Sequence, residues 1–236
     1  MAHGMLQPTA ARDCWLFRRF GSALAAADGQ PVRRHVFVAY HGDQEPVMKL
    51  VIRELTPDLW PALEDLFGEQ GACNGCWCMY WRIGSEYRKR PHVANKAAFQ
   101  KITENEPSPG LLAFAGELAV GWCQLTPRDA LPWLDRTWRL RRVDDLPVWS
   151  LSCFYVRKGY RKQGVTGTLI RAALEVAKRA GAPAVEAYPL DANLTPSASG
   201  TGYLSTFERA GFKIVARHVA PRPILRFEFE PSQRRH

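Results

Sequence analysis

The sequence has no run of about 18 apolar residues, the length that a helix needs to cross a membrane. Its first apolar stretch is broken by charged residues, among them Arg12, Asp13 and Arg18, and therefore lacks the pattern of a secretory leader. Cysteines are too few for a disulfide-stapled fold, with six in 236 residues. We therefore expect a cytoplasmic protein with reduced thiols and no membrane partner.

Acidic residues are in the minority, with 23 Asp and Glu against 32 Lys and Arg, which gives a formal net charge of +9. The basic residues are spread along the chain in runs of three or fewer. A diffuse positive field attracts any polyanion, including the phosphates of a nucleotide cofactor. No segment has the pattern of a recognition helix or an RNA-binding motif, so we expect no nucleic-acid partner.

Sustained apolar periodicity is missing from residues 1–47, where short breakers interrupt the apolar positions. We expect a poorly structured N-terminal extension there and one folded domain over residues 48–236. The apolar content of 46% is typical of a globular domain and excludes a disordered chain.

From residue 48 onward the pattern predicts a mixed order of strands and helices. The expected strands cover residues 50–55, 111–114, 118–125, 148–156, 184–188, 212–219 and 224–229. The expected helices cover residues 59–67, 92–104, 165–179 and 203–210. An early hairpin is followed by later strands that alternate with helices, which indicates an α/β (α+β) fold.

The most informative segment joins the strand at 148–156 to the helix at 165–179. The connection contains four cations: Arg157, Lys158, Arg161 and Lys162. The first N–H groups of a helix have no intrahelical partner, and Gly164 lacks the Cβ that would hold a phosphate away from them. Together these features predict an anion-binding site.

Two other nucleotide-binding motifs fit this segment less well. A P-loop requires a lysine directly after its second glycine, but Val165 follows Gly164 here. A dinucleotide-binding turn follows the first strand of its domain and begins with G-x-G, which this late turn lacks. Glu186 does stand about 20 residues on, where a ribose-binding acid would be.

The hexapeptide Arg161-Lys162-Gln163-Gly164-Val165-Thr166 resembles the Arg/Gln-x-x-Gly-x-Gly/Ala signature of the GNAT superfamily of acyl-CoA-dependent N-acyltransferases. Residues 207–212, Phe-Glu-Arg-Ala-Gly-Phe, resemble the end of a late helix in that superfamily. The order of elements over residues 49–229 is also similar. The resemblance implies a GNAT-like fold, with a central mixed, mostly antiparallel sheet flanked by helices.

The resemblance further implies an N-acetyltransferase that uses acetyl-CoA as cosubstrate and a small-molecule amine as acceptor, acting as a monomer or homodimer. Main-chain groups of Phe154, Tyr155 and Val156 would pair with the pantetheine, where the strands at 148–156 and 184–188 splay apart. The residues expected around the pyrophosphate are Arg161, Lys162, Gln163, Gly164, Val165, Thr166, Gly167 and Thr168.

The expected catalytic groups follow partly from two departures from the family pattern. Thr166 stands where Gly or Ala is usual, and Phe207 stands where many members carry a Tyr that protonates the leaving thiolate. Tyr188 or Tyr203 would then take that role, or the thiolate would leave unassisted. Glu186, an acid inside an apolar strand, is the expected general base unless it faces solvent or pairs with a nearby arginine, and Asp191 just beyond the strand is the reserve. These departures also support an alternative, a non-catalytic CoA-sensing or partner-binding module.

Residues 73–82 are rich in cysteine and tryptophan. Half of a C-x-x-C pair favours zinc only weakly, so we expect no metal, and buried thiols and rings in the core are the simpler interpretation. In the GNAT fold this segment overhangs the acceptor. We therefore expect an aromatic wall of Trp77, Tyr80 and Trp81, with Arg82 as an anchor for an acidic group.

Overall fold

The computed structural model describes residues 34–39, 48–191 and 200–230, of which residues 34–39 are described by their backbone alone. Its strands form one eight-stranded sheet in the order β1-β2-β3-β4-β5-β6-β8-β7. The strands are β1 (Arg34–Ala39), β2 (Met48–Glu54), β3 (Gly110–Ala115), β4 (Leu118–Pro127), β5 (Trp149–Val156), β6 (Ala184–Ala187), β7 (Lys213–Val219) and β8 (Arg222–Glu228). Within this sheet β5 and β6 pair in parallel, and all other neighbours are antiparallel.

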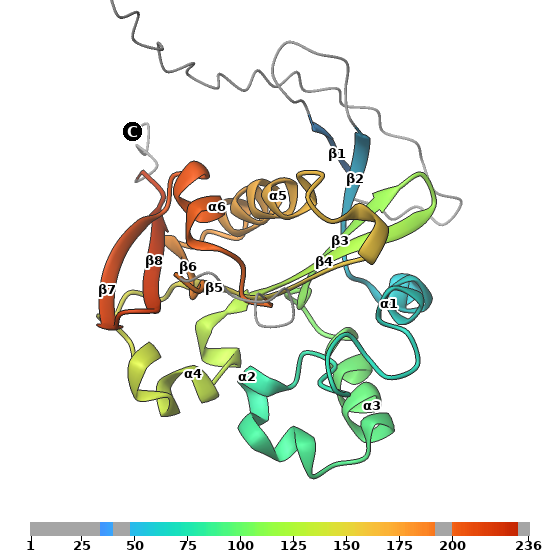
Figure 1. The fold of residues 1–236 in the computed structure, drawn as a ribbon, viewed down its shortest axis with the longest axis horizontal. Coiled ribbons are helices and arrows are strands. Elements are labelled where there is room, and N and C mark those ends of the chain that lie inside the picture. Colours follow the sequence, from blue (N-terminus) through green and yellow to red (C-terminus); the bar gives the residue numbers. More distant parts are fainter. Residues whose placement is uncertain (1–33, 40–47, 192–199, 231–236) are drawn as a thin grey trace, which may run out of the picture.

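Helices cover both faces of the sheet (Figure 1). On one face lie α5 (Val165–Arg179) and α6 (Leu204–Arg209); on the other lie α1 (Trp60–Phe67), α2 (Tyr80–Ile83), α3 (His92–Ile102) and α4 (Trp133–Arg136). The mixed, mostly antiparallel sheet flanked by helices confirms the predicted fold class. Residues 34–39 differ from the predicted unstructured N-terminal extension, because they form strand β1, which pairs with β2 along its whole length.

The α5 face is held by an amphipathic helix. Val165, Leu169 and Val176 recur at helical spacing and are buried against the sheet. Gly121 of β4 permits this close approach, because an added Cβ would lie 2.6 Å from Cγ1 of Val165. The helix runs over residues 165–179, as the sequence predicts.

The opposite face is packed with aromatic rings. Trp77 stacks on Trp60 with ring centroids 5.8 Å apart, and Trp122 meets Phe67 and Phe99 edge-on. This cluster connects α1 and α3 to the sheet and fixes the segment between α1 and α2. No helix in the described part of the chain is long and apolar enough to cross a membrane.

The sheet opens between β5 and β6. These strands pair over Trp149–Leu151 and Val185–Ala187, and β5 then continues to Val156 beyond the end of β6. Just past the paired part, the register with β4 shifts so that Ser152 is an extra residue in β5. Such a bulge bends the strand. We call the diverging region beyond Leu151 the splay.

Candidate active site

The turn between β5 and α5 leaves open space beside Gly164 at the start of the helix. Gly164 has φ +79°, a left-handed conformation that glycine adopts without strain. An added Cβ there would meet no heavy atom within 4 Å in the described part of the chain. The first intrahelical bond of α5 runs from the Thr168 N–H to the Gly164 carbonyl at 3.0 Å. The preceding amides of Val165, Thr166 and Gly167 therefore point out of the helix end.

Thr168 differs from the prediction, because its amide is used inside the helix and its side chain is buried. Its hydroxyl donates to the Gly164 carbonyl at 3.2 Å and accepts a bond from Arg171. Thr168 therefore shapes the helix end and does not present its amide to an anion. The side chain of Val165 is likewise buried in the core.

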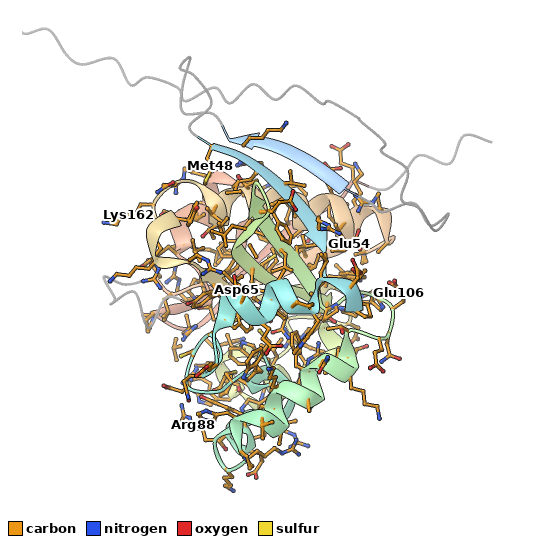
Figure 2. The ribbon with its side chains drawn as sticks, turned by 90° about the vertical axis from the view of Figure 1, so that its right-hand side faces the viewer. Met48, Glu54, Asp65, Arg88, Glu106 and Lys162 are labelled. Atoms are coloured by element: carbon orange, nitrogen blue, oxygen red, sulfur yellow. The ribbon has the colours of Figure 1, made fainter. Side chains whose placement is uncertain are left out.

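The cations of the turn do not act alike. Arg157 donates to the Ala119 carbonyl and pairs with Asp65 of α1 at 2.6 Å, so its charge is already partly neutralised. Arg161 lies exposed and donates to the Val156 carbonyl at 3.1 Å. Lys162 points away from the body of the molecule (Figure 2). We call residues 157–164, with the outward amides of α5, the basic turn.

The main chain of β5 at the splay is already engaged. The Phe154 N–H donates to the carbonyl of Gly200 at 2.6 Å. The Val156 carbonyl accepts the bond from Arg161. A ligand that paired with β5 as an added strand would therefore have to take the place of Gly200 at Phe154. Tyr155 points to the other face, where it packs edge-on against Phe67 with centroids 5.6 Å apart.

Glu186 is buried in an ion-pair network, 2% exposed. Its Oε1 accepts from Arg226 at 2.8 Å and its Oε2 from Arg128 at 3.1 Å. The Tyr188 hydroxyl also donates a hydrogen bond to Oε2. Both carboxylate oxygens are thus occupied, and neither is directed at an incoming amine. The geometry corresponds to the alternative in which Glu186 pairs with arginines. It gives Glu186 a structural role in place of the predicted role of general base.

Tyr188 and Tyr203 lie in contrasting environments. Tyr188 is fully buried, and its hydroxyl contacts Arg128 at 2.6 Å and Ser150 at 2.8 Å as well as Glu186. Burial, with the nearby carboxylate, raises the pKa of Tyr188 above its ordinary value. Tyr203 is 40% exposed and directly precedes α6. Tyr203 is therefore the accessible hydroxyl of the two.

Of the residues predicted to form an aromatic wall, Trp81 contacts the splay directly. Its Nε1–H donates to the Ser152 carbonyl at 3.0 Å, at the bulge of β5. Tyr80 is half-buried and meets the Trp81 ring edge-on at 4.6 Å. We call Tyr80 and Trp81 the aromatic wall. Arg82 is half-buried beside it and donates to the Ala130 carbonyl at 3.1 Å.

Trp77 does not belong to this wall. It is 1% exposed and packs against Trp60 and Phe67 in the core. Its backbone and that of Cys78 have φ values of +45° and +57°, in the left-handed region. This unusual turn directs the indole inward, which spacing along the sequence does not reveal.

A family model described as the acetyltransferase (GNAT) family matches residues 74–197, more than half of the chain. The chain belongs to the GNAT acetyltransferase family. Its fold is similar to that of the GNAT domain of S. lividans PAT, with a TM-score of 0.50 and 18% identity, covering 77% of this chain and 91% of that one. It is also similar to an uncharacterized protein from Bacillus halodurans, with a TM-score of 0.50 and 14% identity, covering 82% and 90% respectively. No curated protein matches.

Phe207 occupies an apolar position in this GNAT protein. It is fully buried on α6, and its ring packs on Phe154 of β5 and on Phe212. Gly202 lies against the same ring, since an added Cβ there would lie 2.8 Å from it. Phe207 thus holds residues 200–202 beside β5 and carries no group that could donate a proton.

Several polar residues of the site were not predicted. Gln124 is fully buried, accepts from the Ser152 hydroxyl at 2.8 Å, and donates to the Cys78 carbonyl at 3.3 Å. Arg128 and Arg222 also line this region. Arg128 lies outside the strands and helices expected from the sequence and gives no sequence signal, because its partners Glu186 and Tyr188 come from a distant part of the chain.

The cysteines lie in different environments. Cys73 is exposed, Cys76 is half-buried, and Cys78 is buried with its Sγ accepting from Trp122 Nε1 at 3.2 Å. Burial raises the pKa of the Cys76 thiol to about 12. No three metal-ligating side chains come together among the residues that the structure describes. The absence of a bound metal remains a prediction.

Proposed function

We propose that this protein is an N-acetyltransferase that moves an acetyl group from acetyl-CoA to the amine of a small-molecule acceptor. The observation that carries the proposal is the basic turn, whose outward amides face open space at Gly164 beside the splay. A pyrophosphate is the anion that suits several convergent N–H groups with flanking cations. Membership of the acetyltransferase family supports the acetyl group as cargo.

The residues present fit coenzyme A in their chemistry. Amides of Val165, Thr166 and Gly167 would bind phosphate oxygens, and Arg161 and Lys162 would add charge at the same helix end. The pantetheine would then run toward the Ser152 bulge along the splayed edge of β5, taking the place of Gly200 at Phe154. Thr166 is half-buried at the first turn of α5, so its hydroxyl can lie close to the phosphates without blocking them.

In the proposed reaction, the neutral amine attacks the thioester carbonyl carbon and forms a C–N bond. The carbonyl oxygen gains negative charge, which a main-chain N–H of β5 would stabilise once Gly200 has left it. The C–S bond then breaks and CoA leaves as a thiolate, while the nitrogen loses its extra proton to solvent, from which the thiolate can take one up. A thiol is acidic enough to leave without help, and exposed Tyr203 is the better-placed donor of the two predicted tyrosines.

A second candidate function is CoA binding without catalysis. Two observations favour it: Phe207 cannot donate a proton, and the Phe154 N–H already has a partner in Gly200. Such a module would bind acetyl-CoA and CoA equally well and release no thiol. The two candidates therefore differ in turnover and not in cofactor affinity.

The experiment is an amine-library screen in which free CoA is measured with a thiol reagent and acetylated products are identified by mass spectrometry. We expect acceptor-dependent CoA release above the hydrolysis rate seen without amine. Calorimetry with CoA on the same preparation reports binding independently. Tight CoA binding with no product from any amine would establish the binding module instead, and failure to bind CoA would reject both candidates.

A further inference from the structure

We infer that the acceptor carries an anionic group, a carboxylate or a phosphate, and that Arg222 binds this group at the acceptor end of the splay. The inference rests on the proposed function and deepens it by naming the class of acceptor.

Arg222 lies at the end of β6, on the border of the splay. It begins β8, and its Nη1 donates to the Tyr188 carbonyl at 3.2 Å and to Thr201 Oγ1 at 3.0 Å. Thr201 directly follows Gly200, whose carbonyl accepts the Phe154 N–H of β5. Two hydrogen bonds therefore fix the guanidinium next to the segment that bridges to β5.

The charge of Arg222 has no carboxylate partner among the described residues, although the side chain is half-buried. Its two acceptors are both neutral. Desolvation by burial, with the like charge of Arg139, lowers the pKa of Arg222 below its ordinary value. A guanidinium with only neutral partners in a partly dehydrated place is unfavourable until an anion joins it.

In contrast to Arg222, the buried arginines Arg226 and Arg128 have carboxylate partners. Arg226 pairs with Glu186 and Asp144, and Arg128 pairs with Glu186 and Asp135. The charges of Arg128 and Arg226 are therefore each met by at least two acids of the chain. Arg222 resembles an arginine whose counter-ion is supplied from outside the chain.

The aromatic wall completes the proposed site. Tyr80 and Trp81 pack in the same apolar cluster as Tyr188, whose carbonyl accepts the hydrogen bond from Arg222. The Tyr80 ring lies edge-on to Trp81, which donates to Ser152 of β5. Arg82 adds a further cation beside the wall: burial lowers its pKa, and it donates a hydrogen bond to the neutral Ala130 carbonyl. An acceptor between Trp81 and Arg222 would have its anion at Arg222 and its amine toward β5.

The chemistry of these groups selects one class of acceptor. A guanidinium binds carboxylate or phosphate oxygens through paired N–H donors. Arg222, Arg139 and Arg82 would repel a polyamine or an aminoglycoside, because such acceptors are cationic throughout. We therefore expect amino acids, or amines that carry a phosphate, to be preferred.

The test compares acceptors that differ only in the anion. Amino acids are paired with their C-terminal amides, and O-phosphoethanolamine is paired with ethanolamine, so the two arms separate carboxylate from phosphate. Acetylation by the full chain is followed as CoA release, and binding of each probe to the CoA-loaded protein is followed by saturation-transfer NMR. The anionic member of at least one pair should have kcat/KM about 10- to 100-fold higher, the range expected for a buried charged hydrogen bond.

Arg222→Met should remove this preference by raising KM for the anionic acceptor, with little change for its neutral partner or for acetyl-CoA affinity. Arg222→Lys should restore part of it, since the charge returns without the fork. Arg217→Met is the matched control: Arg217 lies on the neighbouring strand β7 and is already neutralised by Asp191 at 2.7 Å. It should leave the preference intact.

Equal use or equal binding of the two members of every pair would overturn the anion site. So would an Arg222→Met variant that lowers both members equally while CoA binding is intact. Acetylation of neutral or cationic amines alone would reject the anionic acceptor yet uphold the transferase. A protein that binds the anionic probes but releases no CoA would uphold the site and reject the transferase.

Discussion

The basic turn and the aromatic wall lie on either side of the splay and are built in different ways. The basic turn is one continuous segment, and its outward groups are main-chain amides set by Gly164 and the start of α5. The wall and its surroundings are side chains from α2, β5 and the β7–β8 hairpin, joined by bonds such as Trp81 to Ser152, 71 residues apart. A site that binds its ligand through main-chain amides tolerates many different side chains, whereas a site that binds through side chains depends on the identity of each one. The cofactor end should therefore be common to relatives, and the acceptor end should be particular to this chain.

The largest effect is expected at the basic turn. Gly164→Asp places a side chain and a negative charge where phosphates would lie, and acetyl-CoA affinity should fall roughly 100-fold or more, as two or more charge-assisted hydrogen bonds are lost. Calorimetry measures this. Gly181→Asp is the matched control, because Gly181 has φ +76° and equal space beside the other end of α5. It should lose similar stability and keep its affinity, and unchanged affinity in Gly164→Asp would remove the turn from the cofactor site.

The buried ion pairs next to the splay provide the second test. Glu186→Gln leaves Arg128 and Arg226 facing a neutral amide and should lower the free energy of unfolding by about 3 to 5 kcal/mol. Glu54→Gln breaks a more exposed pair with Arg179 and should cost no more than about 1 kcal/mol. Urea unfolding measures both. A stable Glu186→Gln protein whose kcat is about 100-fold lower, with a deficit that shrinks at high pH, would instead make Glu186 the general base.

Substitutions of Trp81 and Trp77 distinguish the aromatic wall from the core. Trp81→Phe loses the bond to the Ser152 carbonyl and should lower kcat/KM for the acceptor about tenfold, with acetyl-CoA affinity unchanged. Trp77 Nε1 has no hydrogen-bond partner in the described structure, so Trp77→Phe removes ring volume alone. It should lower stability by roughly 1 to 3 kcal/mol with no kinetic change. Steady-state kinetics and thermal unfolding distinguish the two variants. Equal kinetic losses in both would show that Trp81 has no special role at the acceptor site.

The smallest effect concerns the thiols between wall and core. Because burial raises the pKa of Cys76 to about 12, about one thiol in 10,000 is ionised at pH 8. Alkylation of native protein by iodoacetamide should therefore modify exposed Cys73 first, and labelling of Cys76 should rise about tenfold per pH unit. Peptide mass spectrometry reads both sites. Equal labelling at pH 8 would show that the Cys76 thiol is not shielded as described.

Sequence reasoning was most successful where the signal is local. The helix at Val165–Arg179 and the order of the later strands follow from periodicity, and the glycine-containing turn follows from helix-end chemistry. Strand β1 was missed because its six residues lie in a segment without sustained period. The apolar run at residues 36–39 is too short to stand out there, and pairing with β2 supplies what the sequence alone does not.

The acceptor side could not be predicted with the same success because its contacts are long-range. Trp77 and Trp81 are four residues apart and both buried, yet with left-handed backbone at Trp77 and Cys78 the two rings enter different clusters. Glu186 was correctly placed inside a strand, but its partners Arg128 and Arg226 are 58 and 40 residues away. Pairings of this kind are fixed by the folded sheet and leave no trace in local pattern.

The short parallel contact between β5 and β6 has a consequence for local opening. Three residue pairs join these strands, whereas seven join β4 to β5 and four join β6 to β8. The sheet therefore consists of two blocks, strands β1–β5 and strands β6–β8, which meet at this short contact, here called the seam. The hydrogen bond between Arg128 and Glu186 also links the two blocks. Amide hydrogen exchange should report separate opening of the two blocks, since regions with fewer shared bonds open at lower free energy. A molecule bonded to both edges of the splay would lengthen the seam, and the amides of Ala184–Ala187 would then exchange together with those of the larger block.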